Sequence, residues 1–202
     1  MSTHPDVIVQ RSGQSRLPTR YGPFSAGAYR IAGAPIEHLA LSLGTLDATT
    51  PTLVRIHSEC LTGDVFGSRR CDCGPQLDAS LRRIAEAGHG VVVYLRGHEG
   101  RGIGLSHKLR AYQLQDAGLD TVDANVQLGF PVDMRDYGPA LAILADLGVF
   151  RLRMMTNNPD KVTRLSLPPF EVVERVPLVT SPDEESRRYL ETKRDRMGHY
   201  FD

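Results

Sequence analysis

The sequence predicts an α/β fold, a single three-layer domain in which a mixed sheet is flanked by helices. Its 202 residues suffice for one well-filled core. Hydrophobic residues make up 41% of the chain and charged residues 24%, which is the balance of a globular protein. Short apolar segments of strand length alternate with segments of helical periodicity, and this alternation is typical of α/β domains.

The chain shows no internal repeat and no linker, so we expect one domain over residues 17–202. Residues 1–16 mix His, Pro, Ser, Gly and Gln without a period. We therefore expect them to form a flexible N-terminal leader without regular structure.

The first third of the domain is predicted to be rich in strands. Residues 17–22 contain Pro and Gly and indicate a turn. Extended segments follow at residues 28–32, 37–43 and 53–58, where β-branched and other apolar residues are frequent.

The pattern then changes to helical. Apolar residues recur at the spacing of one helix face from residue 76 onwards, and Gly88 marks the end of this helix. The continuous apolar run at residues 91–95 predicts a buried strand. A glycine-rich loop and a helix over residues 105–117 follow.

The last third continues the alternation. Asp136 is a candidate cap for a helix that ends at Gly148 and buries three apolar side chains, namely Leu141, Leu144 and Ala145. Strands are predicted at residues 151–155 and 171–178. Residues 182–199 are dense in opposite charges and predict a solvated C-terminal helix.

Charge and hydropathy exclude several classes of partner. The chain has 24 basic and 24 acidic residues, so no net charge attracts nucleic acid or an anionic membrane. No segment has the length and hydropathy of a membrane span or a secretion signal. We therefore expect a cytoplasmic protein that binds neither nucleic acid nor membrane.

The three cysteines of the chain, Cys60, Cys71 and Cys73, lie within fourteen consecutive positions. An odd number of cysteines in a reducing compartment favours thiolate chemistry over disulfides. Zinc accepts such soft ligands, and three of them leave one position of a tetrahedral ion open. The cluster therefore predicts a zinc site that is open for catalysis.

Three other interpretations of this cluster remain open from the residues alone. His57 is a candidate fourth ligand, which would close the site and make it structural. Reduced cysteines can also serve as small core residues. Residues 57–59 match the His-x-Glu half of a nucleobase deaminase, although the Pro-Cys-x-x-Cys half is missing.

Two loops are candidates for binding phosphate. Residues 97–104 place four glycines and Arg101 between a buried strand and a helix, where backbone amides favour an anion. Residues 156–161 combine Thr156, two asparagines and Lys161 after a strand. A third loop presents Asp133 beside Arg135, which is either a functional pair or a surface salt bridge.

Four segments together resemble the GTP cyclohydrolase II family. They are residues 55–64, 70–74, 99–105 and 156–159, which occur in family order within a match that runs from about residue 17 to the C-terminus. The resemblance implies a stand-alone enzyme with the fold of that family. It would hydrolyse GTP at C8 of guanine, release formate and pyrophosphate, and supply a diaminopyrimidinone ribosyl phosphate to riboflavin biosynthesis.

The resemblance also implies site residues, Zn²⁺ and Mg²⁺ as cofactors, and a homodimer. Zinc would be held by Cys60, Cys71 and Cys73. GTP would be bound by Arg55, Ile56, His57, Ser58, Glu59, Gln76, Glu99, Gly100, Arg101, Thr121, Thr156 and Lys161. The catalytic residues would be Asp133 as proton acceptor, Arg135 as nucleophile toward phosphate, and Tyr112 at the base.

Elementary chemistry qualifies these implied roles. Zinc bound by three thiolates is a weaker Lewis acid than zinc bound by three imidazoles, so a protein base is required. A guanidinium stays protonated, and Arg135 is therefore better suited to clamp the α-phosphate than to attack it. Alternatives to the full reaction are a variant that stops at the formylated product, a deaminase, and a zinc-stabilised nucleotide sensor.

Overall fold

The computed structural model describes residues 7–180 and 184–200. Its seven strands are β1 (Val9–Thr19), β2 (Gly22–Ile31), β3 (Glu37–Leu43), β4 (Thr52–Ser58), β5 (Gly90–Leu95), β6 (Arg151–Met155) and β7 (Glu171–Val176). The helices are α1 (Leu61–Asp64), α2 (Cys73–Ala87), the short 3-10 helix η1 (Glu99–Gly102), α3 (Gly104–Asp116), α4 (Thr121–Gln127), α5 (Gly138–Asp146), α6 (Pro159–Leu165) and α7 (Arg187–Met197).

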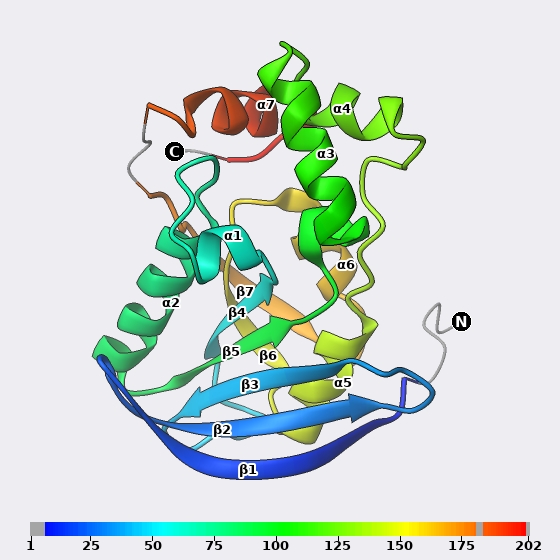
Figure 1. Cartoon of the computed structure of the whole chain (residues 1–202). Coiled ribbons are helices and arrows are strands. Elements are labelled where there is room, and N and C mark those ends of the chain that lie inside the picture. Colours follow the sequence, from blue (N-terminus) through cyan, green and yellow to red (C-terminus); the bar gives the residue numbers. More distant parts are fainter. Residues whose placement is uncertain (1–6, 181–183, 201–202) are drawn as a thin grey trace.

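All seven strands form one mixed sheet in the order β1-β2-β3-β5-β4-β6-β7. The β1-β2-β3-β5 half is antiparallel, whereas β5, β4, β6 and β7 run parallel to one another. In Figure 1 the antiparallel strands lie at the bottom, and α3, α4 and α7 lie together at the opposite end of the molecule. The predicted α/β domain with a mixed sheet flanked by helices is confirmed.

The core lies on both faces of the sheet. Helix α5 packs Leu141, Ile143 and Leu144 against one face, together with Val54 and Ile56 of β4. Helix α2 covers the other face, where Ala79 and Ile84 meet Leu53 of the same strand. A central strand covered on both faces is buried along its length, and in β4 every residue but Ser58 is buried, including Arg55 and His57. The neighbouring strand β5 shows the apolar run that such burial favours.

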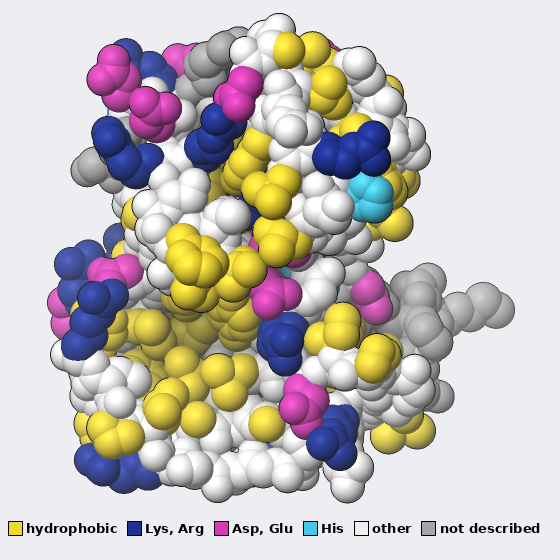
Figure 2. Space-filling model, viewed as in Figure 1, with side chains coloured by type: hydrophobic (Ala, Val, Ile, Leu, Met, Phe, Trp, Pro, Cys, Tyr) yellow, Lys and Arg dark blue, Asp and Glu magenta, His cyan; other side chains and the backbone are white. Residues whose placement is uncertain are grey.

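The face under α2 is only partly covered. Figure 2 shows a hollow lined largely with hydrophobic side chains between the antiparallel strands and the helices above them. Leu39, Leu77 and Leu81 are partly buried side chains that pack against the core on this face. Val65 and Phe66, which follow α1, are 65% and 75% exposed.

Most predicted elements are present. Strands β3 and β6 have the predicted bounds, β4 and β5 each begin one residue earlier than predicted, and α3 is shifted by one residue at both ends. Helix α2 begins three residues earlier than predicted. The turn predicted at residues 17–22 is shorter in the structure, because β1 ends at Thr19 and β2 already begins at Gly22. None of the helices in the described parts of the chain has the length and hydropathy needed to cross a membrane.

The expectation that residues 1–16 lack regular structure is wrong for residues 9–16. These residues belong to β1, whose register with β2 pairs Val9 with Ile31 and Thr19 with Gly22. Residues 1–6 lie outside the described part of the chain. Strand β1 is almost entirely exposed, so it carries no alternation of apolar and polar residues from which a strand is normally predicted.

Three details of the helices also differ. Helix α4 was not predicted, and its N-cap Asp120 accepts hydrogen bonds from the amides of Val122 and Asp123. Helix α5 begins at Gly138, whose amide donates to Asp136 Oδ1, and Ala145 near its end is exposed rather than buried. Helix α7 is shorter than the predicted segment.

Candidate active site

The parallel half of the sheet brings the predicted motifs to one edge. Strands β4, β5 and β6 are parallel neighbours, so their carboxyl ends lie side by side. The cysteines follow β4, the glycine-rich loop follows β5, and residues 156–161 follow β6. This edge is where open α/β sheets bind their ligands.

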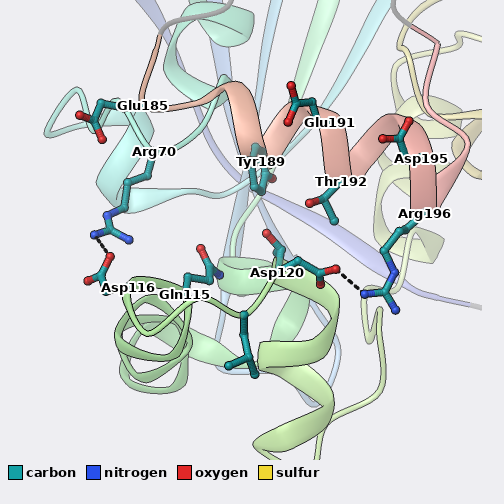
Figure 3. Close-up of a pocket in the computed structure, with 12 residues that line it drawn as sticks. Arg70, Gln115, Asp116, Asp120, Glu185, Tyr189, Glu191, Thr192, Asp195 and Arg196 are labelled. Carbon is teal, nitrogen blue, oxygen red and sulfur yellow. Dashed lines mark hydrogen bonds and ion pairs between the residues drawn. The ribbon is translucent and has the colours of Figure 1, made fainter.

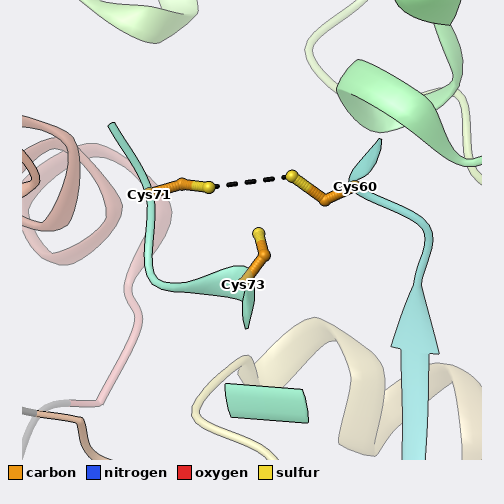
Figure 4. Close-up of side chains that lie close together, drawn as sticks. All are labelled: Cys60, Cys71 and Cys73. Carbon is orange, nitrogen blue, oxygen red and sulfur yellow. Dashed lines mark hydrogen bonds between the residues drawn. The ribbon is translucent and has the colours of Figure 1, made fainter. Parts of the chain in front are cut away.

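The three cysteine sulfurs meet just beyond the end of β4 (Figure 4). Cys60 is the N-cap of α1, Cys71 lies in the loop that follows, and Cys73 begins α2. The Sγ atoms of Cys60 and Cys71 are 3.7 Å apart, and all three Sγ atoms lie within 4.8 Å of one another. Zn–S bonds of about 2.3 Å in a tetrahedral site separate sulfurs by about 3.8 Å.

Two glycines allow the sulfurs to approach so closely. A Cβ atom on Gly63 would lie 3.0 Å from Cys71 Sγ and 3.1 Å from Cys60 Sγ. A Cβ atom on Gly74 would lie 2.4 Å from the carbonyl oxygen of Gly63. Helices α1 and α2 therefore need glycine at both positions, and the resulting cradle of three soft donors fits zinc.

A buried ion pair borders the cysteine cluster. Lys108 of α3 is 7% exposed, and its Nζ donates to Glu99 and, at 3.1 Å, to Cys60 Sγ. Burial opposes the charge of Lys108, but the attraction of Cys60 and the hydrogen bond to Glu99 outweigh it and raise the Lys108 pKa. Hydrogen bonds from Cys71 and Cys73, together with Lys108, lower the pKa of Cys60, which favours the thiolate that a metal requires.

His57 does not join this cluster. Its Nε2 lies 3.0 Å from both carboxylate oxygens of Asp64, and its ring stacks on Tyr94. Asp64 also accepts hydrogen bonds from Tyr94 and from the amide of Cys60. Among the described residues the group placed to hold a metal comprises the three cysteines, so the closed site with His57 as fourth ligand is not formed.

A first pocket, which we call the cysteine pocket, opens beside the sulfurs. Its lining includes both small apolar side chains and polar groups: Ser58, Glu59, Cys60, Cys71, Cys73, His98, Glu99, Gly100, Arg101, Ile103, Lys108, Ala111, Tyr112, Gln115, Thr121, Asn125, Arg135 and Tyr189. Apolar walls with a few polar groups suit a flat heterocycle.

A second pocket, the basic pocket, adjoins the first. It is lined by Arg55, His57, Ser58, Cys73, Gln76, Arg101, Arg135, Thr156, Asn158, Lys161, Tyr189, Lys193, Met197 and His199. Five of these side chains are lysine or arginine, and none is a carboxylate. Ser58, Cys73, Arg101, Arg135 and Tyr189 line both pockets, so one ligand can occupy them together.

Three cationic nitrogens in the basic pocket lack hydrogen-bond partners within the described residues. Both terminal nitrogens of Arg101 and the Nε of Arg55 are buried and have no hydrogen-bond partner within the described residues. Among the described residues, Arg101 is the one non-glycine residue with a positive φ, which is 65°. Burial and the nearby charges of Arg55 and Arg135 lower the pKa of Lys161. An anion bound in this pocket would accept hydrogen bonds from the unpartnered nitrogens and would reduce the repulsion among the neighbouring positive charges.

Arg135 is held in place by Asp133. Its main-chain amide and Nε donate to Asp133 Oδ1 at 3.0 and 2.9 Å, and its Nη2 donates to Oδ2 at 2.5 Å. Burial favours the neutral form of Asp133, but these bonds outweigh it and lower the Asp133 pKa. Burial likewise opposes the charge of Arg135, and Asp133 raises its pKa.

The two pockets together contain all but two of the predicted site residues. Asp133 stands behind Arg135 and is absent from both linings. The side chain of Ile56 points into the core, while its carbonyl oxygen accepts a hydrogen bond of 3.0 Å from Lys161 Nζ. Any contact of Ile56 with a ligand would therefore involve its backbone.

Sequence reasoning missed Lys108, Tyr189 and Lys193. Lys108 sits on a helix with little amphipathic pattern, and the other two lie in the charge-rich segment interpreted as a solvated face. One signal was available in the composition, because lysine occurs only at positions 108, 161 and 193. All three lysines line the two pockets.

His98 predicts a measurable pH dependence of stability. Burial, reinforced by the charges of Arg135 and Lys161, lowers the pKa of His98 to about 4. A histidine in the unfolded chain has a pKa of about 6.5. The stabilisation that comes from keeping His98 neutral is therefore complete above that pH and is lost as the pH falls toward 4. Between pH 7 and pH 5 we expect the free energy of unfolding of the wild type to fall by about 2 kcal/mol more than that of His98→Asn. Urea unfolding at both pH values measures this, and equal losses would contradict it.

Comparison with known proteins agrees with this geometry. The family model for GTP cyclohydrolase II matches residues 10–177. The riboflavin biosynthesis protein RibBA of Mycobacteroides abscessus is 57% identical over 195 residues, which cover 95% of this chain and 47% of that protein. RibBA of Mycobacterium avium is 56% identical over 195 residues, covering 95% and 46%. The chain spans about half the length of these curated relatives.

A solved structure also matches, namely RibBX, a two-domain 3,4-dihydroxy-2-butanone 4-phosphate synthase from A. baumannii. It is 24% identical, has a TM-score of 0.47, and is matched over 89% of this chain and 42% of that one. The family match, by contrast, runs from β1 through β7 and includes the cysteines and all three predicted loops. The chain therefore belongs to the GTP cyclohydrolase II family of hydrolases.

Proposed function

We propose that this protein hydrolyses GTP at C8 of the guanine ring and releases formate and pyrophosphate. The product would be a diaminopyrimidinone ribosyl phosphate that enters riboflavin biosynthesis, the process named for its RibBA relatives. The single observation that carries the proposal is the junction of a thiolate-lined pocket with a basic pocket. A nucleotide has the matching division into a flat base and an anionic tail.

We assign one end of GTP to each of the two pockets. Guanine would enter the cysteine pocket beside Tyr112, with Glu99, Gly100 and Thr121 near its edge. The triphosphate, together with Mg²⁺, would occupy the basic pocket, where Arg101, Lys161 and Thr156 offer donors. Arg55 and Gln76 bond to each other at 2.7 Å and form the far wall of this pocket.

Zinc held by Cys60, Cys71 and Cys73 would supply a Lewis acid that makes water a better nucleophile. The proton from that water needs an acceptor, and we propose Asp133. Its base strength is low while Arg135 binds it. When phosphate attracts Arg135, Asp133 loses these hydrogen bonds and becomes a stronger base. Glu59 lines the cysteine pocket and is the second candidate acceptor.

Tyr112 would act as a hydrogen-bond donor to the base. Burial raises its pKa, although the nearby charge of Lys108 opposes this. The phenol therefore stays protonated at neutral pH. Lys108 Nζ lies 5.6 Å from the centre of its ring and Arg70 Cζ lies 4.9 Å from it, so two cations pack against Tyr112.

Arg135→Ala is expected to slow pyrophosphate release about a hundredfold, because a buried cationic donor to the developing phosphate charge is lost. Arg135 lines both pockets, which supports its proposed role as a clamp on the α-phosphate. A coupled assay for pyrophosphate measures the effect. Arg153→Ala removes an exposed arginine that pairs with Glu174 and serves as the matched control. An unchanged rate in Arg135→Ala would remove this residue from the mechanism.

One incubation tests the proposed function as a whole. The zinc-loaded protein is mixed with GTP and Mg²⁺, and formate, pyrophosphate and ammonia are measured together. Formate and pyrophosphate in equal amounts support the proposal. Pyrophosphate without formate indicates the variant that stops at the formylated product, ammonia without formate indicates a deaminase, and tight GTP binding without turnover indicates a nucleotide sensor.

Further properties belong to the same proposal. We propose that the protein acts in the cytoplasm on a small-molecule substrate, binds neither nucleic acid nor membrane, and assembles as a homodimer. The balance of 24 basic and 24 acidic residues supports the absence of nucleic acid as a partner. The homodimer rests on family resemblance, and light scattering of the purified chain tests it.

A further inference from the structure

Helix α7 lies beyond the residues that define the family match and nevertheless borders the site. The match ends at residue 177, whereas α7 spans Arg187–Met197. Tyr189 of this helix lines both pockets, and Lys193 lines the basic pocket. The family match therefore assigns nothing to residues that form part of the wall.

Four contacts hold α7 and the residues just after it over the site. Lys193 Nζ donates to Asp72 Oδ1 at 2.6 Å, next to the cysteine cluster. At the other end of the helix Arg196 pairs with Asp120 and Asp123 of the α4 segment, and Figure 3 shows the first of these pairs. Beyond the helix, the amide of Tyr200 donates to the carbonyl oxygen of Asn157 at 2.9 Å. Helix α7 and the residues after it thus contact Asp72 between two of the cysteines, the α4 segment, and the loop after β6.

The use of lysine in this chain singles out Lys193. Arginine supplies 21 of the 24 basic residues, and the three lysines are 7%, 5% and 9% exposed at positions 108, 161 and 193. Among the described arginines, Arg55 alone is buried to this degree. All three lysines line the two pockets, whereas most of the arginines do not.

The surroundings of Lys193 leave part of its ammonium group available. Asp72, which holds it from behind, is 5% exposed and does not line the basic pocket. Asp72 Oδ2 also accepts from Gln76 Nε2 at 2.5 Å, so its second oxygen is engaged. An ammonium has three donors, and within the described residues Lys193 uses one of them, toward Asp72. Lys193 Nζ also lies 4.4 Å from the centre of the Tyr189 ring, and both residues line the basic pocket.

We propose that Lys193 is a further substrate-binding residue, which holds the phosphate chain of the nucleotide, and that α7 thereby completes the site from outside the family core. This inference rests on the proposed function, since it takes GTP as the ligand. It adds a fifth cationic side chain to those of Arg55, Arg101, Arg135 and Lys161 around the basic pocket. Asp72 keeps the ammonium oriented and is a positioning residue.

A phosphate contact makes a specific prediction about which ligands lose affinity. Loss of the Lys193 charge should weaken ligands that carry the triphosphate and spare guanosine, which has none. A charge-assisted hydrogen bond of ordinary strength corresponds to about tenfold to hundredfold in affinity. A purely structural role of Lys193 would instead weaken both ligands alike, because the whole site would be distorted.

The experiment uses the full chain loaded with zinc. Lys193→Gln removes the charge and keeps a donor toward Asp72, Lys193→Met removes both, and Lys193→Arg restores the charge. Arg194→Met is the control, because Arg194 is an exposed neighbour on α7 that pairs with Asp195. Calorimetry with the α,β-methylene analogue of GTP and with guanosine measures binding, and thermal unfolding with zinc analysis verifies that each variant is folded and loaded.

Support for the inference is a loss of about tenfold or more for the analogue in Lys193→Gln, with guanosine affinity changed less than about twofold and recovery in Lys193→Arg. Unchanged binding of the analogue, or equal losses for both ligands, overturns it. Lys193→Met provides the same comparison where Lys193→Gln does not fold. Formate release by the wild-type chain is assayed in parallel. Absence of formate would count against the proposed function, whereas the affinities of the variants test the role of Lys193.

Discussion

Cys71→Ser is expected to leave the protein without zinc and without detectable formate release. The variant keeps two of the three soft donors, and the hydroxyl that replaces the third is a poor zinc ligand at neutral pH. Cys71 Sγ lies 3.7 Å from Cys60 Sγ, so its loss removes one of the three donors that surround the proposed ion. Metal analysis should fall from about one zinc per chain to near zero.

The control for this variant is Val65→Ala, a change at a 65% exposed residue just beyond α1. It leaves the three sulfurs and both glycines of the cradle intact, and we expect wild-type zinc content and formate release. Full activity in zinc-free Cys71→Ser would contradict the metal assignment. Retention of zinc with loss of activity would place Cys71 in the reaction rather than in metal binding.

Gly74→Ala is expected to have the second large effect, on stability and zinc binding together. The added Cβ would lie 2.4 Å from the carbonyl oxygen of Gly63, and backbone cannot move aside as a side chain can. Relief requires α1 and α2 to separate, which also separates Cys60 from Cys73. Overpacking of this kind costs about 3 kcal/mol or more. Urea unfolding of the zinc-loaded protein and metal analysis measure the two consequences.

Gly13→Ala separates this steric effect from the general consequences of replacing glycine. A Cβ atom on Gly13 has no heavy atom within 4 Å, and the residue lies in β1, far along the sheet from the cysteines. We expect its stability to stay within about 0.5 kcal/mol of wild type. If Gly74→Ala matched this control in stability and zinc content, the close approach of α1 and α2 would not hold the cluster together.

The fold was predictable where elements are buried. Strands β3 and β6 and helix α5 follow directly from apolar runs and from the glycine that ends the helix. The strand that the prediction missed has the opposite property. Strand β1 is exposed along nearly its whole length, so its pairing with β2 depends on backbone hydrogen bonds that the pattern of side chains does not reveal.

The site was predictable where it follows a strand. Parallel β4, β5 and β6 deliver their loops to one edge, so residues 55–60, 97–104 and 156–161 had to converge once the strands were recognised. Contributions from helices that cross over this edge follow no such rule. Lys108 and Lys193 reach the pockets through tertiary packing of α3 and α7, which the sequence pattern of each helix leaves undetermined.

The left-handed backbone of Arg101 has a consequence for how fast and how selectively ligands are taken up. A non-glycine residue at φ 65° is strained, and the strain is present before any ligand arrives. Both terminal nitrogens of its guanidinium are also buried before a ligand arrives, so little side-chain conformational entropy is lost on association. Such preorganisation favours anions whose shape matches the loop.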